Sequence, residues 1–307
     1  MYRAIDWSSV RGIAFDLDGT LYRADGELFY GGFVRHLAAR LKNGRPALLL
    51  AEYERWRRGD SPFLGDYLYD ARRRWLVNWQ GSAAVGAFYP YGGRAVDEQV
   101  LGRAYRDGSP PARLIRMGDG WTQLGCAAQC YGATLKDIIA AYDAFQEEII
   151  ADPSAFGIVA DALLAETLRL LRRRGYLIAL VTMSSGEAVG GKLRALGVAD
   201  SFDAIMEGVP KPEGSQDALR RLSEMCCVKV ASWLMVGDNP VNDLAPAREL
   251  GLPTILVNQA APRAEADTDV QAETLADCLA LLTEHLPALA VASATVGGLA
   301  PKDEPDA

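Results

Sequence analysis

The chain has 307 residues, of which 50% are hydrophobic and 23% are charged, and its formal net charge is -8. This length allows one large domain or two smaller ones around a sizeable core. The negative charge argues against a general nucleic-acid-binding protein, because such proteins need a positive field toward phosphate. No segment is long and apolar enough for a membrane span or a signal peptide, so we expect a cytoplasmic protein without a membrane partner.

The cysteines and histidines limit the chemistry that the chain can support. Neither a zinc-like spacing of cysteines nor a recognisable catalytic histidine occurs, so zinc sites and histidine-dependent triads are not expected. We expect the cysteines to be reduced and packed. The residues concerned are Cys126, Cys130, Cys226, Cys227, Cys278, His36 and His285.

The first predicted element is a strand that ends in acid. Residues 13–15 are an apolar run that suits a buried strand of a parallel sheet, and Asp16 follows at once. Asp18 comes two residues later, and Gly19 allows a tight turn. Two carboxylates so close repel each other unless a cation or a shared proton compensates, and Mg²⁺ is the natural oxygen-bound cation. The plainer alternative is a strand end followed by an Asp-Gly turn.

The next part of the chain interrupts the pattern of an α/β sheet. Residues 21–30 predict a hairpin around Asp25-Gly26. Residues 31–155 predict a mostly helical insertion, with loops at 81–93 and 108–111. The predicted helices of this insertion cover residues 33–41, 47–58, 67–79, 97–105 and 134–150.

Strands and helices alternate regularly from residue 158 onward. The predicted strands cover residues 176–181, 202–206, 233–236 and 254–257. The predicted helices cover residues 159–174, 187–196, 215–226, 242–250 and 275–286. Thr182, Lys211 and Asp238 follow the first three of these strands, and a doubly wound parallel sheet would bring them to one edge beside Asp16.

These polar residues suit a metal-assisted phosphate site. Asp16 and Asp238 could bind one Mg²⁺, and Asp243 could hold a metal-bound water or brace Lys211. Thr182 and the backbone N–H groups after it suit a phosphate oxygen, while Lys211 supplies positive charge. Each residue also has a plainer interpretation, such as a strand-end hydroxyl for Thr182, a loop charge for Lys211 or a helix-start charge for Asp243.

The joint order of four short motifs resembles the haloacid dehalogenase superfamily. They are Asp16-Leu17-Asp18-Gly19-Thr20, Val181-Thr182, Lys211-Pro212 and the run from Gly237 to Asp243. The resemblance implies an α/β fold, with a Rossmann-like core formed by residues 1–24 and 156–287 and an inserted helical cap formed by residues 25–155. Residues 288–307 are expected to be a disordered tail.

The resemblance further implies a Mg²⁺-dependent phosphatase that acts on a small phosphorylated metabolite. Asp16 would be the nucleophile, Asp18 the general acid and base, and Lys211 a catalytic and phosphate-binding cation. Thr182 and Met183 would also bind the phosphate, Met183 through its backbone where the family often has a small polar residue. The implied metal ligands are Asp16, Asp18 and Asp238, and Asp243 would support them without binding the metal directly.

Several alternatives stay open at this point. A phosphotransferase or phosphomutase would use the same core residues, whereas a non-catalytic binding protein would usually have lost some of them. Dehalogenases of the family lack the acid at the position of Asp18. Phosphonate hydrolysis would need a cap lysine, for which Lys136 and Lys42 are weak candidates.

The cap's arginines and aromatic residues could contact a substrate, but solvated and core positions are more usual for them. These residues are Arg55, Arg57, Arg58, Arg72, Arg73, Arg74, Arg94, Trp75, Trp79, Tyr89, Tyr91 and Trp121. The sequence indicates neither the substrate nor the oligomeric state.

Overall fold

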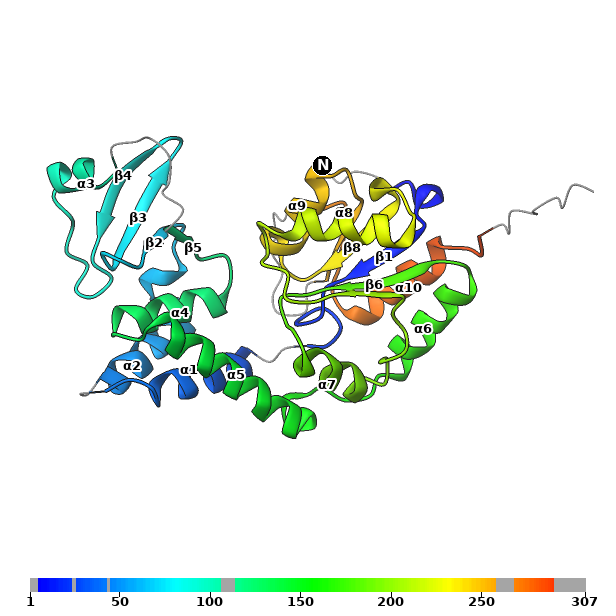
Figure 1. The fold of residues 1–307 in the computed structure, drawn as a ribbon, viewed down its shortest axis with the longest axis horizontal. Coiled ribbons are helices and arrows are strands. Elements are labelled where there is room, and N and C mark those ends of the chain that lie inside the picture. Colours follow the sequence, from blue (N-terminus) through cyan, green and yellow to red (C-terminus); the bar gives the residue numbers. More distant parts are fainter. Residues whose placement is uncertain (1–4, 24–25, 43–44, 106–113, 258–267, 290–307) are drawn as a thin grey trace, which may run out of the picture.

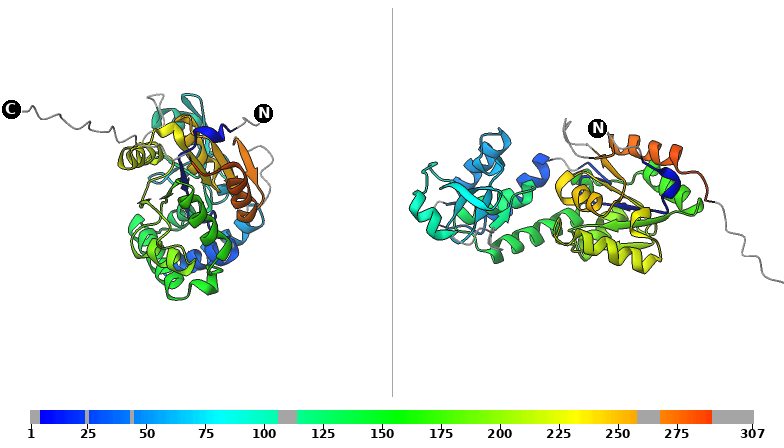
Figure 2. Two further views of the ribbon diagram at one scale, coloured as in Figure 1. Left: turned by 90° about the vertical axis from the view of Figure 1, so that its right-hand side faces the viewer. Right: turned by 90° about the horizontal axis from the view of Figure 1, so that it is seen from above.

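The computed structural model describes residues 5–23, 26–42, 45–105, 114–257 and 268–289. These residues form two lobes, a larger α/β core and a region inserted into it after the first strand (Figure 1). The lobes lie at opposite ends of the long axis, as the view from above also shows (Figure 2). Among the described residues, no helix combines the length and apolar character that crossing a bilayer would need.

The core contains a six-stranded sheet in the order β10-β9-β8-β1-β6-β7, and every pair in it is parallel. Its strands are β1 (Gly12–Phe15), β6 (Leu177–Val181), β7 (Ala204–Met206), β8 (Trp233–Gly237), β9 (Thr254–Val257) and β10 (Val270–Ala272). Strand β1 is central and fully buried. The predicted α/β class is therefore confirmed, while β10 is a strand that was not predicted.

Helices cover both faces of this sheet. The core helices are α6 (Ala162–Arg173), α7 (Glu187–Ala195), α8 (Ser215–Cys226), α9 (Ala245–Glu249) and α10 (Leu275–His285). Ile13 and Phe15 of β1 join one hydrophobic cluster with α6, α7 and α10, while Ala14 joins another with α8 and α9. Side chains of a strand alternate between faces, so one short apolar run supports both layers. A π turn over Pro240–Leu244 precedes α9, where the sequence predicted a single helix from residue 242.

The inserted region contains helices and a small antiparallel sheet. Its helices are α1 (Gly26–Ala38), α2 (Arg45–Arg57), α3 (Glu98–Ala104), α4 (Gly120–Cys130) and α5 (Leu135–Ala151). Its sheet has the order β4-β3-β2-β5, with β2 (Leu68–Asp70), β3 (Trp75–Gln80), β4 (Ala83–Phe88) and β5 (Leu114–Arg116). The domain boundaries expected at residues 24, 155 and 287 stay a prediction.

Two predictions for the inserted region were wrong because its short apolar runs fit both the periodicity of a helix and that of a strand. The helix predicted over residues 67–79 is instead the pair β2 and β3. The buried Asp70 accepts hydrogen bonds from the N–H groups of Arg72 and Arg73 and so fixes the turn between them. The loop predicted over residues 81–93 contains β4, which pairs with β3.

The hairpin predicted over residues 21–30 was also wrong. Helix α1 begins at Gly26, and its buried Phe29, Phe33 and Leu37 follow a helical spacing of four residues. Phe29 packs on Phe145 of α5, with ring centroids 6.2 Å apart. Helix α4, which contains Gly120 and Gly125, was not predicted. The loop predicted at residues 108–111 and all but the first two residues of the expected tail lie outside the described residues.

The remaining helix predictions in the inserted region are confirmed, including α2, α3 and α5. Thr134 begins α5 with a capping box to Asp137.

The cysteines are free thiols, with Cys126 and Cys278 buried. His36 contacts Glu148 at 2.7 Å, while His285 stacks on Trp7.

Candidate active site

The polar residues predicted at strand ends meet at one edge of the core sheet. Asp16 directly follows β1, and its N–H donates to the carbonyl of Val236 in β8 at 2.9 Å. Thr182 and Asp238 directly follow β6 and β8, the two neighbours of β1. The parallel arrangement brings together residues that lie far apart in the chain, as expected at the carboxyl ends of such strands.

Lys211 lies between two carboxylates at the centre of the site. Its Nζ donates to Oδ1 of Asp16 at 2.6 Å and to Oδ1 of Asp243 at 2.7 Å. All three residues are buried. A charge that is removed from water needs partners nearby, and each member of this triad supplies one. The plainer interpretation of Lys211 as an exposed loop charge is therefore wrong, because its ammonium group is the centre of a buried ion-pair group.

The environment shifts the proton affinities of this triad. Burial raises the pKa of Asp16 to about 7; the Lys211 ammonium opposes this rise, and the nearby acids Asp243 and Asp18 add to it. For Lys211, burial alone would lower the pKa, but Asp16 and Asp243 raise it above its ordinary value. Lys211 therefore stays charged at neutral pH, and a second cation would favour the ionised form of Asp16.

Three carboxylates gather where such a cation could bind. One oxygen each from Asp16, Asp238 and Asp243 lies within 4.8 Å of the other two. Gly19 has a φ of +90°, and a Cβ at this position would lie only 2.5 Å from Oδ2 of Asp238. This glycine therefore lets the loop after β1 approach the carboxylate. An all-oxygen donor set with excess negative charge fits a hard divalent cation.

The grouping of the carboxylates differs from the predicted metal set in one member. Asp16 and Asp238 belong to the observed group, whereas Asp18 does not and Asp243 takes the third place. Asp243 also accepts the N–H of Asn239 with Oδ2 at 3.0 Å, in addition to its contact with Lys211. The contact with Lys211 is one of the two considered for Asp243 from the sequence, and the role of Asp243 in the reaction stays a prediction.

Asp18 lies among a different set of partners. Its Oδ1 accepts hydrogen bonds from Nζ of Lys192 at 2.5 Å and from the hydroxyl of Tyr22, and its Oδ2 accepts one from Oγ of Ser184 at 2.7 Å. Burial alone would raise the pKa of Asp18, but the Lys192 ammonium and these hydrogen bonds hold it below its usual value. The two aspartates of the first motif thus have separate lysine partners.

Two of the three predicted phosphate-binding residues, Thr182 and Met183, lie at the end of β6. Thr182 is fully buried, and its Oγ1 accepts the N–H of Ser184 at 3.1 Å. The side chain of Met183 is exposed, so a role for this residue would rest on its backbone. This geometry is a strand-to-helix turn that leads into α7.

The sequence did not predict that Lys192, Ser184 and Tyr22 belong to the site as hydrogen-bond partners of Asp18. Lys192 did carry a signal, because it lies on the side of α7 that buries Ala188, Val189 and Leu193. A lysine on an apolar face needs an acidic partner.

Two side-chain contacts between described residues join the inserted region to the site. The hydroxyl of Tyr142 in α5 lies 3.4 Å from that of Ser184, and Oδ2 of Asp119 accepts a hydrogen bond from Nδ2 of Asn242 at 3.0 Å. Trp121 packs on Tyr142, with ring centroids 5.6 Å apart. Tyr142 and Asp119 therefore bring the inserted region to the loops after β6 and β8.

Three of the arginines considered as substrate contacts have partners within the inserted region itself. Arg55 pairs with Glu52, Arg73 with Asp70, and Arg94 lies over Tyr89. Lys42 and Lys136 are exposed.

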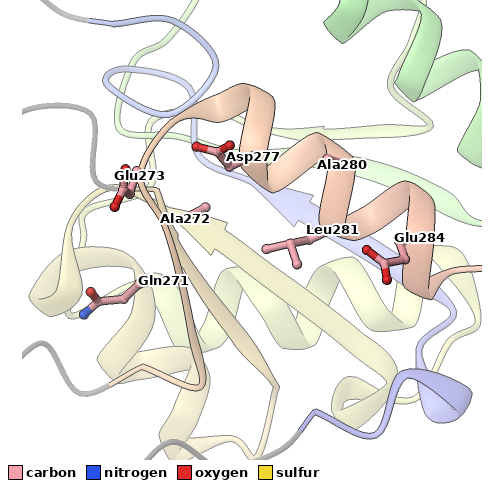
Figure 3. A pocket seen from close by; sticks show the side chains of 7 residues that line it. All are labelled: Gln271, Ala272, Glu273, Asp277, Ala280, Leu281 and Glu284. Atoms are coloured by element: carbon pink, nitrogen blue, oxygen red, sulfur yellow. The ribbon is translucent and has the colours of Figure 1, made fainter.

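The described residues also line a cavity of about 370 Å³ at the far edge of the sheet, between β10 and α10 (Figure 3). Its acidic lining includes Glu273, Asp277 and Glu284. None of the residues named above for the site lines it, and two strands, β9 and β8, separate β10 from β1.

A family model for haloacid dehalogenase-like hydrolases matches residues 10–251, which include β1 and all four motifs. The chain belongs to this family. The match covers both the core strands that carry the site and the inserted region between β1 and β6. The chain is thus a hydrolase of the haloacid dehalogenase type, as the motifs indicated.

Curated relatives of this hydrolase include two phosphoglycolate phosphatases. The one from Vibrio vulnificus (strain CMCP6) is 33% identical over 120 residues, which are 37% of this chain and 52% of the relative. The one from Thiobacillus denitrificans is 29% identical over 125 residues, 39% of this chain and 55% of the relative. The chain therefore spans about half the length of the curated relatives it matches.

Among solved structures, the hydrolase is similar to the putative HAD-hydrolase YfnB from Bacillus subtilis bound to magnesium. The TM-score is 0.48 and the sequence identity is 14%, with 89% of this chain and 99% of that chain covered.

Proposed function

We propose that this haloacid dehalogenase-like hydrolase is a Mg²⁺-dependent phosphatase that hydrolyses a small phosphomonoester through an aspartyl-phosphate on Asp16. The observation that carries the proposal is the buried Asp16 carboxylate, held by Lys211 beside Asp238 and Asp243, with a second acid at Asp18. The names of the two curated relatives support a phosphatase. We therefore include phosphoglycolate among the substrates to be tested.

Mg²⁺ would be held by Asp16, Asp238 and Asp243, where it supplies positive charge that stabilises the developing charge on phosphate. Lys211 holds the Asp16 carboxylate in place and reduces the repulsion between this anion and the anionic phosphate. Thr182 and the backbone of Met183 bind phosphate oxygens at the turn after β6. The substrate phosphate is thus surrounded by cationic groups and hydrogen-bond donors.

The reaction proceeds in two displacements. An oxygen of Asp16 forms a bond to phosphorus as the bond to the leaving oxygen breaks, and Asp18 gives that oxygen a proton that it has taken from solvent after the anionic substrate has bound. This uptake is needed because the contacts of Asp18 hold its pKa low in the substrate-free site, and the negative charge of the phosphate raises it. Asp18 then takes a proton from water, whose oxygen bonds to phosphorus and displaces the Asp16 carboxylate. The products are an alcohol and inorganic phosphate. Asp18 favours this reaction over halide displacement, because a departing halide needs no proton.

The test is release of inorganic phosphate from a panel of phosphomonoesters that includes phosphoglycolate, sugar phosphates and nucleotides. We expect release with Mg²⁺, and we expect an excess of EDTA to abolish it and renewed Mg²⁺ to restore it. Release that is unaffected by EDTA would contradict the metal requirement. If phosphate appears only as a transfer product on an added alcohol acceptor, the protein is a phosphotransferase instead.

Mg²⁺ binding should weaken as the pH falls below about 7. The pKa of Asp16 is raised from 3.8 to about 7 in the folded protein, so a bound proton competes with the cation below that pH. The apparent affinity should fall by roughly tenfold per pH unit there and level off above it. The same shift means that Asp16 stabilises the metal-free fold at low pH and that this contribution is lost as the pH rises from 3.8 to about 7.

Calorimetric titration with Mg²⁺ at about pH 6 and about pH 8 measures this effect. Equal affinities at the two pH values would contradict the raised pKa of Asp16.

A further inference from the structure

Lys192 is a fully buried lysine that the reaction described above does not use. It lies on α7, its side chain is 1% exposed, and its neighbours Ala188, Val189 and Leu193 are buried apolar residues. An ammonium group in such surroundings loses its hydration and must be compensated by a nearby anion. The surrounding contacts identify this anion as Asp18.

Three hydrogen-bond donors from three segments hold the Asp18 carboxylate. Lys192 and Tyr22 donate to Oδ1, and Ser184 donates to Oδ2. Nζ of Lys192 also lies 3.4 Å from Oγ of Ser184, so the two donors support each other. Because both oxygens are engaged from different directions, the carboxylate cannot rotate without breaking at least one of these contacts.

The same contacts connect Asp18 with the inserted region. The Tyr142 hydroxyl of α5 lies 3.4 Å from Oγ of Ser184. Ser184 therefore connects Tyr142 with Asp18, to which it donates its own hydrogen bond. Helix α5 also packs on α7, where a Cβ at Gly191, the residue before Lys192, would lie 3.1 Å from Ile150. One helix of the inserted region therefore contacts both the helix that carries Lys192, beside which α5 ends in Figure 1, and the hydroxyl that binds Asp18.

We propose that Lys192 is a positioning residue for Asp18: it holds the acid at the place from which the proton passes to the leaving oxygen and is later taken from water. This inference rests on the proposed phosphatase function. The site would then contain two buried lysines with separate tasks, Lys211 for the nucleophile Asp16 and Lys192 for the acid Asp18. A small displacement of a proton donor slows proton transfer, whereas it leaves steps without proton transfer nearly unchanged.

The test uses this dependence on the leaving group. p-Nitrophenolate leaves without a proton, whereas the alkoxide of an alkyl phosphomonoester needs one. In Lys192→Met we expect kcat for the best alkyl substrate of the panel to fall by roughly 10- to 100-fold, with little change in KM. The kcat/KM for p-nitrophenyl phosphate, which reports only the steps up to formation of the phospho-enzyme, should fall less than about threefold.

Leu193→Ala is the matched control, because it disturbs the buried face of α7 without a contact to Asp18. It should affect both substrates by the same factor. In an Asp18→Asn background, Lys192→Met should cause no further loss, because the residue that it positions is already inactive.

An equal loss of kcat/KM for both substrates in Lys192→Met, or a full additional loss in the Asp18→Asn background, would overturn the role of Lys192 while the phosphatase function stands. A wild-type protein that releases no phosphate from either substrate would instead refute the proposed function. In that case a crystal structure of Lys192→Met decides the inference alone: an Asp18 carboxylate that has moved supports positioning, and an unmoved one rejects it.

Discussion

Replacing Asp16 by asparagine should lower phosphate release by at least roughly 10³-fold while the protein stays folded. The amide has the shape of the carboxylate but cannot form the acyl phosphate, so the first displacement is blocked. Its oxygen can still accept the hydrogen bond from Lys211 that the carboxylate accepts at 2.6 Å. The substitution also removes a buried negative charge beside Asp243, so a large loss of stability is not expected.

The measurements are phosphate release with Mg²⁺ and thermal unfolding for the wild type and Asp16→Asn. Asp217→Asn is the matched control, because the side chain of Asp217 is 82% exposed on α8 and lies outside the site. This control should retain wild-type activity. Asp16→Asn with activity within a few fold of the wild type would contradict the nucleophile assignment.

Replacing Lys211 by methionine should have the second-largest effect, and it should act on both stability and activity. The side chain is 2% exposed and is the shared partner of Asp16 and Asp243. Removing one partner of a buried ion pair leaves uncompensated charge, which typically costs about 3–5 kcal/mol of unfolding free energy. The loss should be smaller at low pH, because protonated carboxyl groups no longer need the ammonium.

Activity should fall by roughly 10²- to 10³-fold in Lys211→Met even where the variant is folded, because the charge that stabilises the phosphate transition state is missing. Urea unfolding without Mg²⁺ at two pH values measures the stability, and phosphate release measures the activity. Lys229→Met is the control, since Lys229 is exposed at the start of a short 3-10 helix. A Lys211→Met variant that unfolds like the wild type at neutral pH would contradict the expected cost of leaving the buried carboxylates of Asp16 and Asp243 without their cation.

The core of the fold was accessible from the sequence because its signals are local. The three parallel strands β1, β6 and β8 are short apolar runs that are each followed by a polar residue, as at Phe15-Asp16, Val181-Thr182 and Gly237-Asp238. Parallel strands place such ends at one sheet edge, so the order of the motifs was enough to predict that Asp16, Lys211 and Asp238 meet. The amphipathic helices α6 and α8 were equally clear, since they show one apolar face over three turns.

The inserted region was less predictable because its elements depend on their neighbours. The run around Tyr69 and Trp75 is aromatic and apolar at several spacings, so local periodicity fits a helix as well as two strands. This segment forms the strands β2 and β3 because β2 pairs with β5 and because Asp70 fixes the turn between the two strands. Helix α1 was obscured by an Asp-Gly pair that is typical of hairpins, although Phe29 and Phe33 already had helical spacing.

The sequence by itself determined which chemistry the site supports, because carboxylates and one lysine at strand ends favour a cation and an anionic substrate. Only the tertiary structure decided how those groups are shared. It assigned Lys211 to Asp16 and Asp243, and it joined Asp18 to Lys192, which is 174 positions away in the chain. A pairing of buried charges depends on three-dimensional proximity and on the loss of water around both groups, and neither is visible in local sequence spacing.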